Sequence, residues 1–234
     1  MVWDALVAAL GRVGPGPLTV LDAGGGTGGF SVPLAGLGHR VTVVDPSPDS
    51  LAALERRATE EGVAAAITGV QGDLSSLLDH VAPGTVDVVL CHSVLEVVDD
   101  PAAGVAAVAA AVRTGGLASV VAANRTAAVV SRALAGRFAE AEAALDDPAG
   151  RWGAGDAAQR RFGRAELVTL LADAGLVADE VHGVRVFTDL VPGALLDSDA
   201  AAFEALVRLE TAVAGRDPYR DVATQLHVLA TRTV

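Results

Sequence analysis

The stretch Leu21–Gly29, LDAGGGTGG, constrains the fold of this chain more than any other. An apolar run at 18–21 leads into it and predicts a buried strand, and apolar residues at helical spacing (Phe30, Leu34, Leu37) follow it. Glycines between a strand and a helix predict a tight turn whose backbone N–H groups can approach a ligand at the helix N-terminus. The stretch is therefore a candidate nucleotide-binding turn of an α/β sheet.

Two nucleotide cofactors compete for this turn. The spacing Gly24-x-Gly26-x-x-Gly29 satisfies the dinucleotide pattern. Asp22, however, stands at the carboxyl end of the strand, where its charge would repel a pyrophosphate and favour a cationic ligand. S-adenosylmethionine is such a ligand, with a sulfonium and an ammonium group. The Asp-x-Gly-x-Gly start resembles the first motif of the class I methyltransferases; a glycine-rich surface turn without a ligand is the remaining alternative.

Length and composition limit the other classes. The 234 residues are 51% hydrophobic, enough for one large α/β domain with an elaboration. All 17 basic residues are arginine and the net charge is −12, which excludes a protein that coats nucleic acid nonspecifically, although a local arginine cluster could bind a structured RNA. The single cysteine, Cys91, excludes an internal disulfide framework and a cysteine-based metal cluster. We expect a cytoplasmic protein with no membrane span and no metal, because residues 1–10 lack a signal-peptide pattern.

Beyond the turn, strands and helices alternate and predict a parallel sheet with helices on both faces. The predicted strands are 40–45, 67–70, 86–91 and 117–123, with helices from Pro48 (N-cap Ser47) and over 101–112, and a turn at Gly115-Gly116. Asp45 ends the second of these five strands, where it can accept hydrogen bonds from the ribose of an adenosine. His92 follows the fourth strand, beside the first, where the reacting group of the ligand would lie; a hydrogen-bonded structural histidine is equally compatible with the pattern.

The alternation breaks at residues 124–164. A helical stretch from Ala127 to Leu145 and a polar loop from Asp146 to Gly163 predict an inserted lid for substrate recognition. Four arginines (Arg151, Arg160, Arg161, Arg164) make the loop locally basic, unless it is an ordinary solvated loop. A helix at 164–174, a strand at 181–187, a helix at 198–214 and a strand at 225–231 follow. We therefore expect one domain over 1–234, with a cofactor half (1–123), a lid (124–164) and a closing segment (165–234).

Several motifs together resemble the tRNA 5-carboxymethoxyuridine methyltransferases. They are Leu21–Gly26, Cys91–Glu96, Gly183–Phe187, Leu209–Thr211 and Asp217–Tyr219. The resemblance implies a Rossmann-like, seven-stranded, mostly parallel sheet closed by an antiparallel strand pair. It also implies methyl transfer from S-adenosylmethionine to the carboxylate of 5-carboxymethoxyuridine at the tRNA wobble position, with S-adenosylhomocysteine as the other product.

The same resemblance assigns cofactor contacts, and it has two limits. The cofactor-contacting positions are Gly24, Gly25, Asp45, Asp73, Leu74 and His92, to which the pattern of the glycine turn adds Asp22 and Gly26. The acid at position 73 would face the adenine amino group, and it also fits a helix N-cap; the two roles can coexist. The family has a further N-terminal segment that covers the cofactor, which we expect to precede this chain's first residue, and a lysine-rich lid where this chain has scattered arginines.

The expected chemistry needs an anion anchor rather than a base. A carboxylate is already ionised near neutral pH, so we expect no catalytic residue and a reaction helped by proximity. Arg185 is the candidate anchor, because a guanidinium can bind a carboxylate or phosphate through two nitrogens; a surface ion pair is the alternative. Tyr219 could stack on a base or fill the core, and Arg160 and Arg161 are further candidates for substrate binding.

Three other functions remain compatible with the sequence. The first is methylation of a small-molecule carboxylate or hydroxyl. The second is an NAD-dependent reductase, against which Asp22 and the lack of a Tyr-x-x-x-Lys pair both argue. The third is a partner protein that binds S-adenosylmethionine without catalysis.

Overall fold

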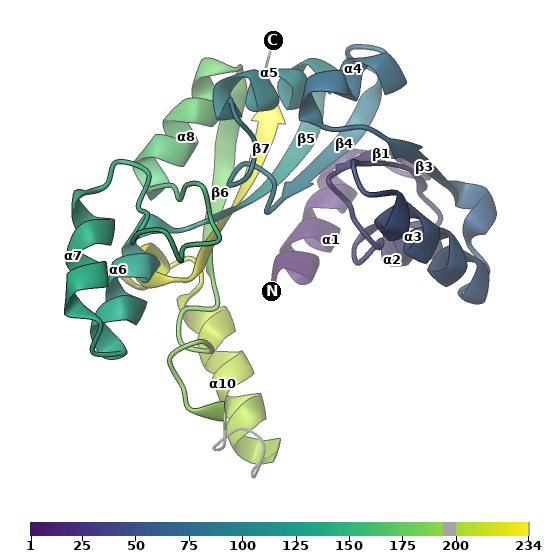
Figure 1. Ribbon diagram of the computed structural model, residues 1–234. Coiled ribbons are helices and arrows are strands. Elements are labelled where there is room, and N and C mark those ends of the chain that lie inside the picture. The colour runs from purple at the N-terminus through teal and green to yellow at the C-terminus, as the bar shows by residue number, and fades with distance from the viewer. Residues whose placement is uncertain (194–199, 234) are drawn as a thin grey trace.

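The computed structural model describes residues 1–193 and 200–233, which form one sheet covered by helices (Figure 1). The strands are β1 (Thr19–Ala23), β2 (Arg40–Asp45), β3 (Ile67–Gln71), β4 (Val86–His92), β5 (Val112–Ala123), β6 (Leu176–Val184) and β7 (Gln225–Arg232). The helices are α1 (Val2–Val13), α2 (Ser31–Gly36), α3 (Pro48–Glu60), α4 (Leu77–His80), α5 (Pro101–Ala111), α6 (Arg125–Leu134), α7 (Phe138–Asp146), α8 (Arg164–Asp173) and α10 (Ala200–Val213).

The seven strands lie in the order β3-β2-β1-β4-β5-β7-β6. All neighbouring pairs from β3 to β5 are parallel, and β7 runs antiparallel to both β5 and β6. This order confirms the predicted Rossmann-like α/β fold, and it places the ends of β1 and β4 side by side, where the strand order reverses. The glycine turn after β1 therefore faces the loop after β4.

Alternating residues of the central strands divide between two cores, one on each face of the sheet. Val88 and Leu90 of β4 belong to a core that includes buried residues of α1, α2 and α3. Val89 and Cys91 of the same strand belong to the other core, with α4, α5 and α8. The near-continuous apolar runs in the sequence follow from this double burial. No helix among the described residues is long and apolar enough to cross a membrane.

Three boundaries differ from the sequence-based expectations. The predicted strand 181–187 is wrong: β6 spans Leu176–Val184 and ends because Arg185 adopts a left-handed backbone with φ +57°. The single helix expected over 127–145 is two helices, separated at Gly136, whose φ is +72°. The turn expected at Gly115-Gly116 is an irregular part of β5, which starts at Val112.

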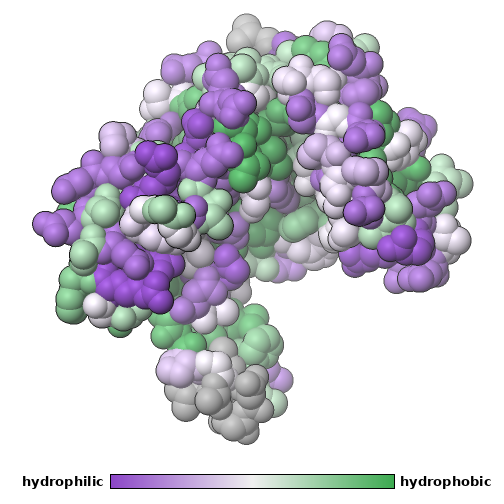
Figure 2. Space-filling view, in the orientation of Figure 1, coloured by the Kyte–Doolittle hydropathy of each residue, from purple (hydrophilic) through white to green (hydrophobic). Residues whose placement is uncertain are grey.

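The elements after β5 lie apart from the cofactor half. Figure 1 shows α6 and α7 together at one end of the molecule, far from α1, α2 and α3, and α10 extending away from the sheet. The expected start of the last helix, Ser198, lies outside the described residues. The middle of the same face in Figure 2 exposes apolar residues between hydrophilic surfaces on both sides.

Candidate functional site

The glycine turn is shaped by close packing against its own protein. A Cβ added at Gly24 would lie 2.4 Å from Val94 Cγ2, and one added at Gly28 would lie 2.4 Å from Leu54 Cδ1. Gly24, Gly26 and Gly28 also have φ values of +75°, +54° and +82°, which favour glycine. Gly29, the third glycine of the dinucleotide pattern, has nothing within 4 Å of its added Cβ. The geometry therefore supplies a reason for glycine at 24, 26 and 28, but none at 29.

Asp22 lies beneath this turn, almost fully buried. Its Oδ2 accepts a hydrogen bond of 2.6 Å from the Ser31 hydroxyl, and a Cβ on Gly25 would lie 2.6 Å from the same oxygen. Burial raises the pKa of Asp22 to about 6, against the opposing effect of the Ser31 hydrogen bond. No cationic side chain among the described residues pairs with Asp22, so this part of the site carries an uncompensated acid.

Asp45 connects the turn to the start of α3. It is 7% exposed; its Oδ2 accepts from the Gly26 N–H at 2.9 Å and its Oδ1 from the Ser47 N–H at 2.9 Å. Each carboxylate oxygen has further acceptor capacity, so Asp45 can still receive hydroxyl groups. These two carboxylates and the turn fit a ligand that carries both a ribose and a positive charge, as S-adenosylmethionine does.

Asp73 and Leu74 follow β3. Asp73 accepts hydrogen bonds from the Ser75 hydroxyl (2.6 Å), the Ser75 N–H (2.8 Å) and the Ser76 N–H, and those to Ser75 hold its pKa below the usual value. The N-cap role is thereby confirmed, for the short 3₁₀ helix Leu74–Ser76. Leu74 is buried against Gly104 of α5. Contact of these two residues with an adenine stays a prediction.

His92 lies between the glycine turn and the middle of the sheet. Its ring meets Phe30, which follows Gly29, edge to face at 4.6 Å between centroids. Its Nε2 is 2.8 Å from the Ser119 hydroxyl, which is in turn 2.9 Å from Nε2 of His227. Burial lowers the pKa of His92 to about 4, so the ring is neutral near pH 7. One ring nitrogen thus has a structural partner, and Nδ1 has none among the described residues.

Two of the described residues other than glycine have left-handed backbones, and the sheet brings them near each other. Ser93, after β4, and Arg185, after β6, both have φ +57°. Gln225 pairs with Val184 in the β6–β7 ladder, and its Nε2 donates to the Ser93 hydroxyl at 2.9 Å. Arg185 is half-exposed and its Nε lies 3.4 Å from Asp189. Strained backbone of this kind is often found at functional sites, and here it lies beside the end of β4.

The segment after β6 is held by Glu210 of α10, a residue for which the sequence predicted no individual role. The Glu210 carboxylate accepts from the N–H groups of Val186 and Phe187 at 2.8 Å and of Thr188 at 2.7 Å, and from the Thr188 hydroxyl at 2.8 Å. Burial alone would raise the pKa of Glu210, but these hydrogen bonds outweigh burial and the net pKa is lowered. Tyr219, 45% exposed, lies 6.3 Å from Phe187 between ring centroids, so it does not fill the core.

The two candidate arginines of the loop have different surroundings. Arg161 is buried and bonds both oxygens of Asp156, at 2.7 and 2.8 Å, and its guanidinium stacks on Trp152. We therefore assign Arg161 to the structure of the loop itself. Arg160 bonds the Asp99 carbonyl at 3.1 Å and lines a cavity of about 360 Å³ with Arg125 and the start of α5.

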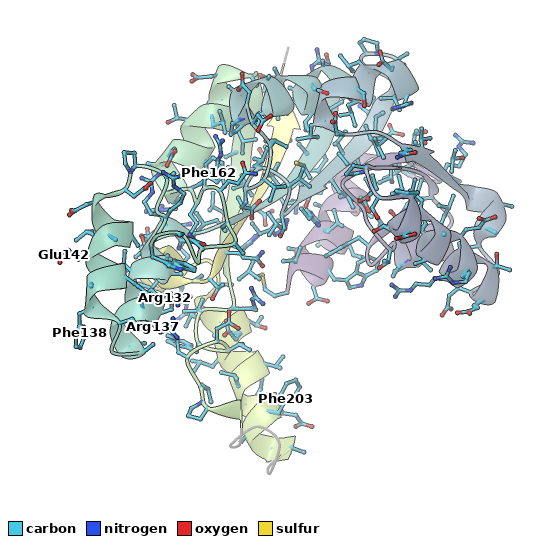
Figure 3. All side chains as sticks on the ribbon, viewed as in Figure 1. Arg132, Arg137, Phe138, Glu142, Phe162 and Phe203 are labelled. Carbon is cyan, nitrogen blue, oxygen red and sulfur yellow. The ribbon has the colours of Figure 1, made fainter. Side chains whose placement is uncertain are left out.

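The arginines of α6, α7 and the loop have acidic partners close by. Figure 3 places Arg132 and Arg137 where Figure 2 shows a strongly hydrophilic surface, and both arginines contact Glu140. Arg151 pairs with Asp147 at 3.0 Å. The local basic surface that the sequence predicted is thus largely neutralised by carboxylates of the same segment.

Comparison with known proteins gives consistent results. Residues 21–120 match the family described as "Methyltransferase domain". The chain is 29% identical over 230 residues to the tRNA 5-carboxymethoxyuridine methyltransferase of Escherichia coli K12, which covers 98% of this chain and 86% of that protein. It is 39% identical over 107 residues to a ubiquinone biosynthesis O-methyltransferase of Methylocella silvestris, covering 44% of this chain and 40% of the relative.

Solved structures share the fold. An S-adenosylmethionine-dependent methyltransferase from Mesorhizobium loti superposes with a TM-score of 0.65 at 21% identity, over 98% of this chain and 97% of that one. The magnesium protoporphyrin IX methyltransferase of Synechocystis, which has S-adenosylhomocysteine bound, gives a TM-score of 0.63 at 19% identity, over 99% of this chain and 81% of that one.

Proposed function

Because this chain is an S-adenosylmethionine-dependent methyltransferase of class I, we propose that it methylates the carboxylate of 5-carboxymethoxyuridine at the wobble position of tRNA. The acceptor oxygen forms its bond to the methyl carbon as the bond from that carbon to the sulfonium sulfur breaks. The products are a methyl ester and S-adenosylhomocysteine. No proton is transferred, so the protein has to hold and orient the two reactants rather than supply a base.

The observation that carries this proposal is the similarity to the tRNA enzyme over nearly the whole chain, including its C-terminal third. Three motifs of that third meet in space. Glu210 of Leu209–Thr211 binds the backbone of 186–188, and Phe187 contacts Tyr219 of Asp217–Tyr219. We call the surface formed by 183–188, Glu210 and 217–219 the C-terminal platform. It adjoins the end of β4 through the hydrogen bond from Gln225 to Ser93.

On this platform Arg185 is the proposed anchor for the acceptor carboxylate. Its side chain is 47% exposed, and its contact with Asp189 is a surface pair that a ligand carboxylate can replace. Tyr219 offers an exposed ring for stacking on a base, worth about 1–3 kcal/mol in single-stranded RNA complexes. Arg160, in the cavity beside α5, is the proposed contact for a flanking phosphate, and residues 124–164 the proposed lid.

A second candidate is a small carboxylic acid as acceptor. It is favoured by the pairing of Arg132, Arg137, Arg151 and Arg161 with nearby acids, which leaves little open positive surface for a polyanion. The net charge of −12 has the same implication. Both candidates use the same cofactor and the same anchor.

The deciding experiment is transfer of a labelled methyl group from S-adenosylmethionine to tRNA from cells that lack the wobble methyl ester, followed by nucleoside digestion. We expect label in 5-methoxycarbonylmethoxyuridine. Arg185→Gln should lower kcat/KM at least tenfold without changing S-adenosylhomocysteine affinity, because it removes a charged hydrogen-bond donor to the acceptor. Arg151→Gln, which removes one equally exposed charge beside Asp147, is the matched control. An unlabelled RNA, with S-adenosylhomocysteine still raising the Tm, would favour the small carboxylic acid.

A further inference from the structure

A continuous row of polar side chains crosses four strands of the sheet. The strand register aligns His92 of β4 with Val121 of β5, Val121 with His227 of β7, and His227 with His182 of β6. Ser119, two residues before Val121 and on the same face, bridges the gap that the valine leaves. Its hydroxyl lies 2.8 Å from His92 Nε2 and 2.9 Å from His227 Nε2. Ser119 and His227 are both fully buried.

We propose that Ser119 and His227 are positioning residues that hold His92 in the tautomer with its proton on Nδ1, so that His92 offers a neutral hydrogen-bond donor to a carboxylate of the bound ligands. The inference rests on the proposed function only in taking a carboxylate ligand as given. That carboxylate belongs either to the cofactor's amino acid part or to the acceptor.

The number of protons limits how these three side chains can bond. A serine hydroxyl has one hydrogen and can donate to only one of the two histidines. The two imidazoles are the only hydrogen-bond partners of the Ser119 hydroxyl among the described residues. If both histidines donated to it, the buried hydroxyl hydrogen would have no acceptor. One histidine must therefore donate through Nε2–H, and the other must accept at Nε2 and hold its proton on Nδ1.

The surroundings of the two rings decide which histidine does which. Nδ1 of His227 has no partner in the described part of the chain, and its residue is fully buried. An unpaired buried N–H is rarer and more unfavourable than an unpaired acceptor, so Nδ1 of His227 is unprotonated and its Nε2 donates to Ser119. The Ser119 hydroxyl then donates to His92 Nε2, and the proton of His92 lies on Nδ1. Burial, and then the positive charges of His92, His182 and the chain amino group, lower the pKa of His227 to about 3, which keeps that ring neutral.

His92 is the member of the row that meets the ligand site. Its predecessor Cys91 pairs with Ala23 at the base of the glycine turn, and its ring contacts Phe30 directly after that turn. His92 is also partly exposed, unlike His227. An N–H on its Nδ1 has no acceptor among the described residues, and a ligand carboxylate would supply one.

Nitrogen NMR of the histidine-labelled, full-length protein tests the tautomer directly. In the unaltered protein we expect Nδ1 of His92 and Nε2 of His227 to give the signals of protonated nitrogens. Ser119→Ala should shift His92 toward the Nε2–H form, and Ser131→Ala in α6 is the matched control that leaves it unchanged. A His92 signal with the proton on Nε2 in the unaltered protein overturns the proposal, and this measurement does not depend on the variants' folding or on the acceptor.

Binding measurements identify the carboxylate. Ser119→Ala should weaken S-adenosylhomocysteine about three- to tenfold, the effect of one net hydrogen bond, and leave 5′-methylthioadenosine, which lacks the amino acid part, unchanged if the cofactor supplies it. If the acceptor supplies it, only the acceptor KM rises. His227→Gln, which retains an N–H donor near the position of Nε2, should restore what His227→Leu loses. Equal behaviour of the two His227 variants, or unchanged affinities and KM in Ser119→Ala, would contradict the positioning role.

Discussion

Replacement of Asp22 by asparagine should stabilise the protein at neutral pH while weakening its affinity for the cofactor. Asparagine has nearly the shape of the protonated carboxyl group and can still accept the 2.6 Å hydrogen bond from Ser31. It cannot ionise. The variant therefore removes the buried charge beneath the glycine turn and leaves the packing around Gly25 in place.

The magnitude follows from the pKa of Asp22. Burial raises this pKa from 3.8 to about 6 in the folded state. Because one pKa unit corresponds to about 1.4 kcal/mol, ionised Asp22 lowers the free energy of unfolding by about 3 kcal/mol above pH 6. The sign follows from linkage: between the two pKa values the folded state binds more protons, so stability is retained at low pH and falls as pH rises through the folded pKa.

The assay is urea unfolding of the wild type and Asp22→Asn between about pH 4 and about pH 8. We expect equal stabilities at the acid end and a variant more stable by about 2–3 kcal/mol at the alkaline end. S-adenosylmethionine affinity of the wild type should rise with pH through this range, because the sulfonium and ammonium charges favour ionised Asp22. S-adenosylhomocysteine, which lacks the sulfonium charge, should respond less, and the variant should lose the difference.

A stability difference that does not change with pH would refute this reasoning, since it would show that the charge of Asp22 is not what the fold opposes. A variant less stable than the wild type at pH 8 would do the same. Ser31→Ala is the matched comparison: it removes the hydrogen bond that favours the ionised form, so it should raise the pKa of Asp22 further and increase the pH dependence.

Three further predictions concern the turn and the platform. Gly28→Ala should lower stability by about 1–3 kcal/mol and weaken cofactor binding in calorimetry, since its Cβ would clash with Leu54, whereas Gly29→Ala should change neither. Asp45→Ala should weaken S-adenosylhomocysteine binding at least tenfold, because it removes the acceptor of the Gly26 N–H as well as the proposed ribose contact. Glu210→Ala should lower the free energy of unfolding by about 2–3 kcal/mol near neutral pH; the lowered pKa means that the contribution is present above the unfolded pKa and fades as pH falls through the folded one, so unfolding curves of wild type and variant should converge in acid.

The sequence predicted the sheet well because periodic burial leaves a direct record in the order of residues. The runs 40–45 and 86–91 are apolar since both faces of β2 and β4 are covered, and Asp45 stands at a strand end because a charged residue ends such a run. The cap at Ser47 was predictable for the same reason: its hydrogen bond to Ser50 is local.

Long-range partners leave no such record. Arg160 and Arg161 are neighbours with equal side chains, yet one is buried with Asp156 and the other lines a cavity. Glu210 binds the backbone of residues 22–24 positions earlier in the chain, and backbone groups carry no sequence signal at all. The end of β6 was missed because Arg185 adopts a left-handed backbone, for which a residue other than glycine gives no warning.

The charge distribution explains why the C-terminal platform must be rigid if the acceptor is an anion. With a net charge of −12, the long-range field of the protein repels a carboxylate or a phosphate, and the arginines that could oppose this field are mostly paired. Binding then depends on a few short-range contacts, and such contacts are strong only when their geometry is fixed beforehand. Glu210 fixes 186–188 with four hydrogen bonds, directly after the left-handed turn at Arg185. The carboxylate that holds this backbone thereby sets the direction of the guanidinium beside it, so an acidic residue serves anion binding in an acidic protein.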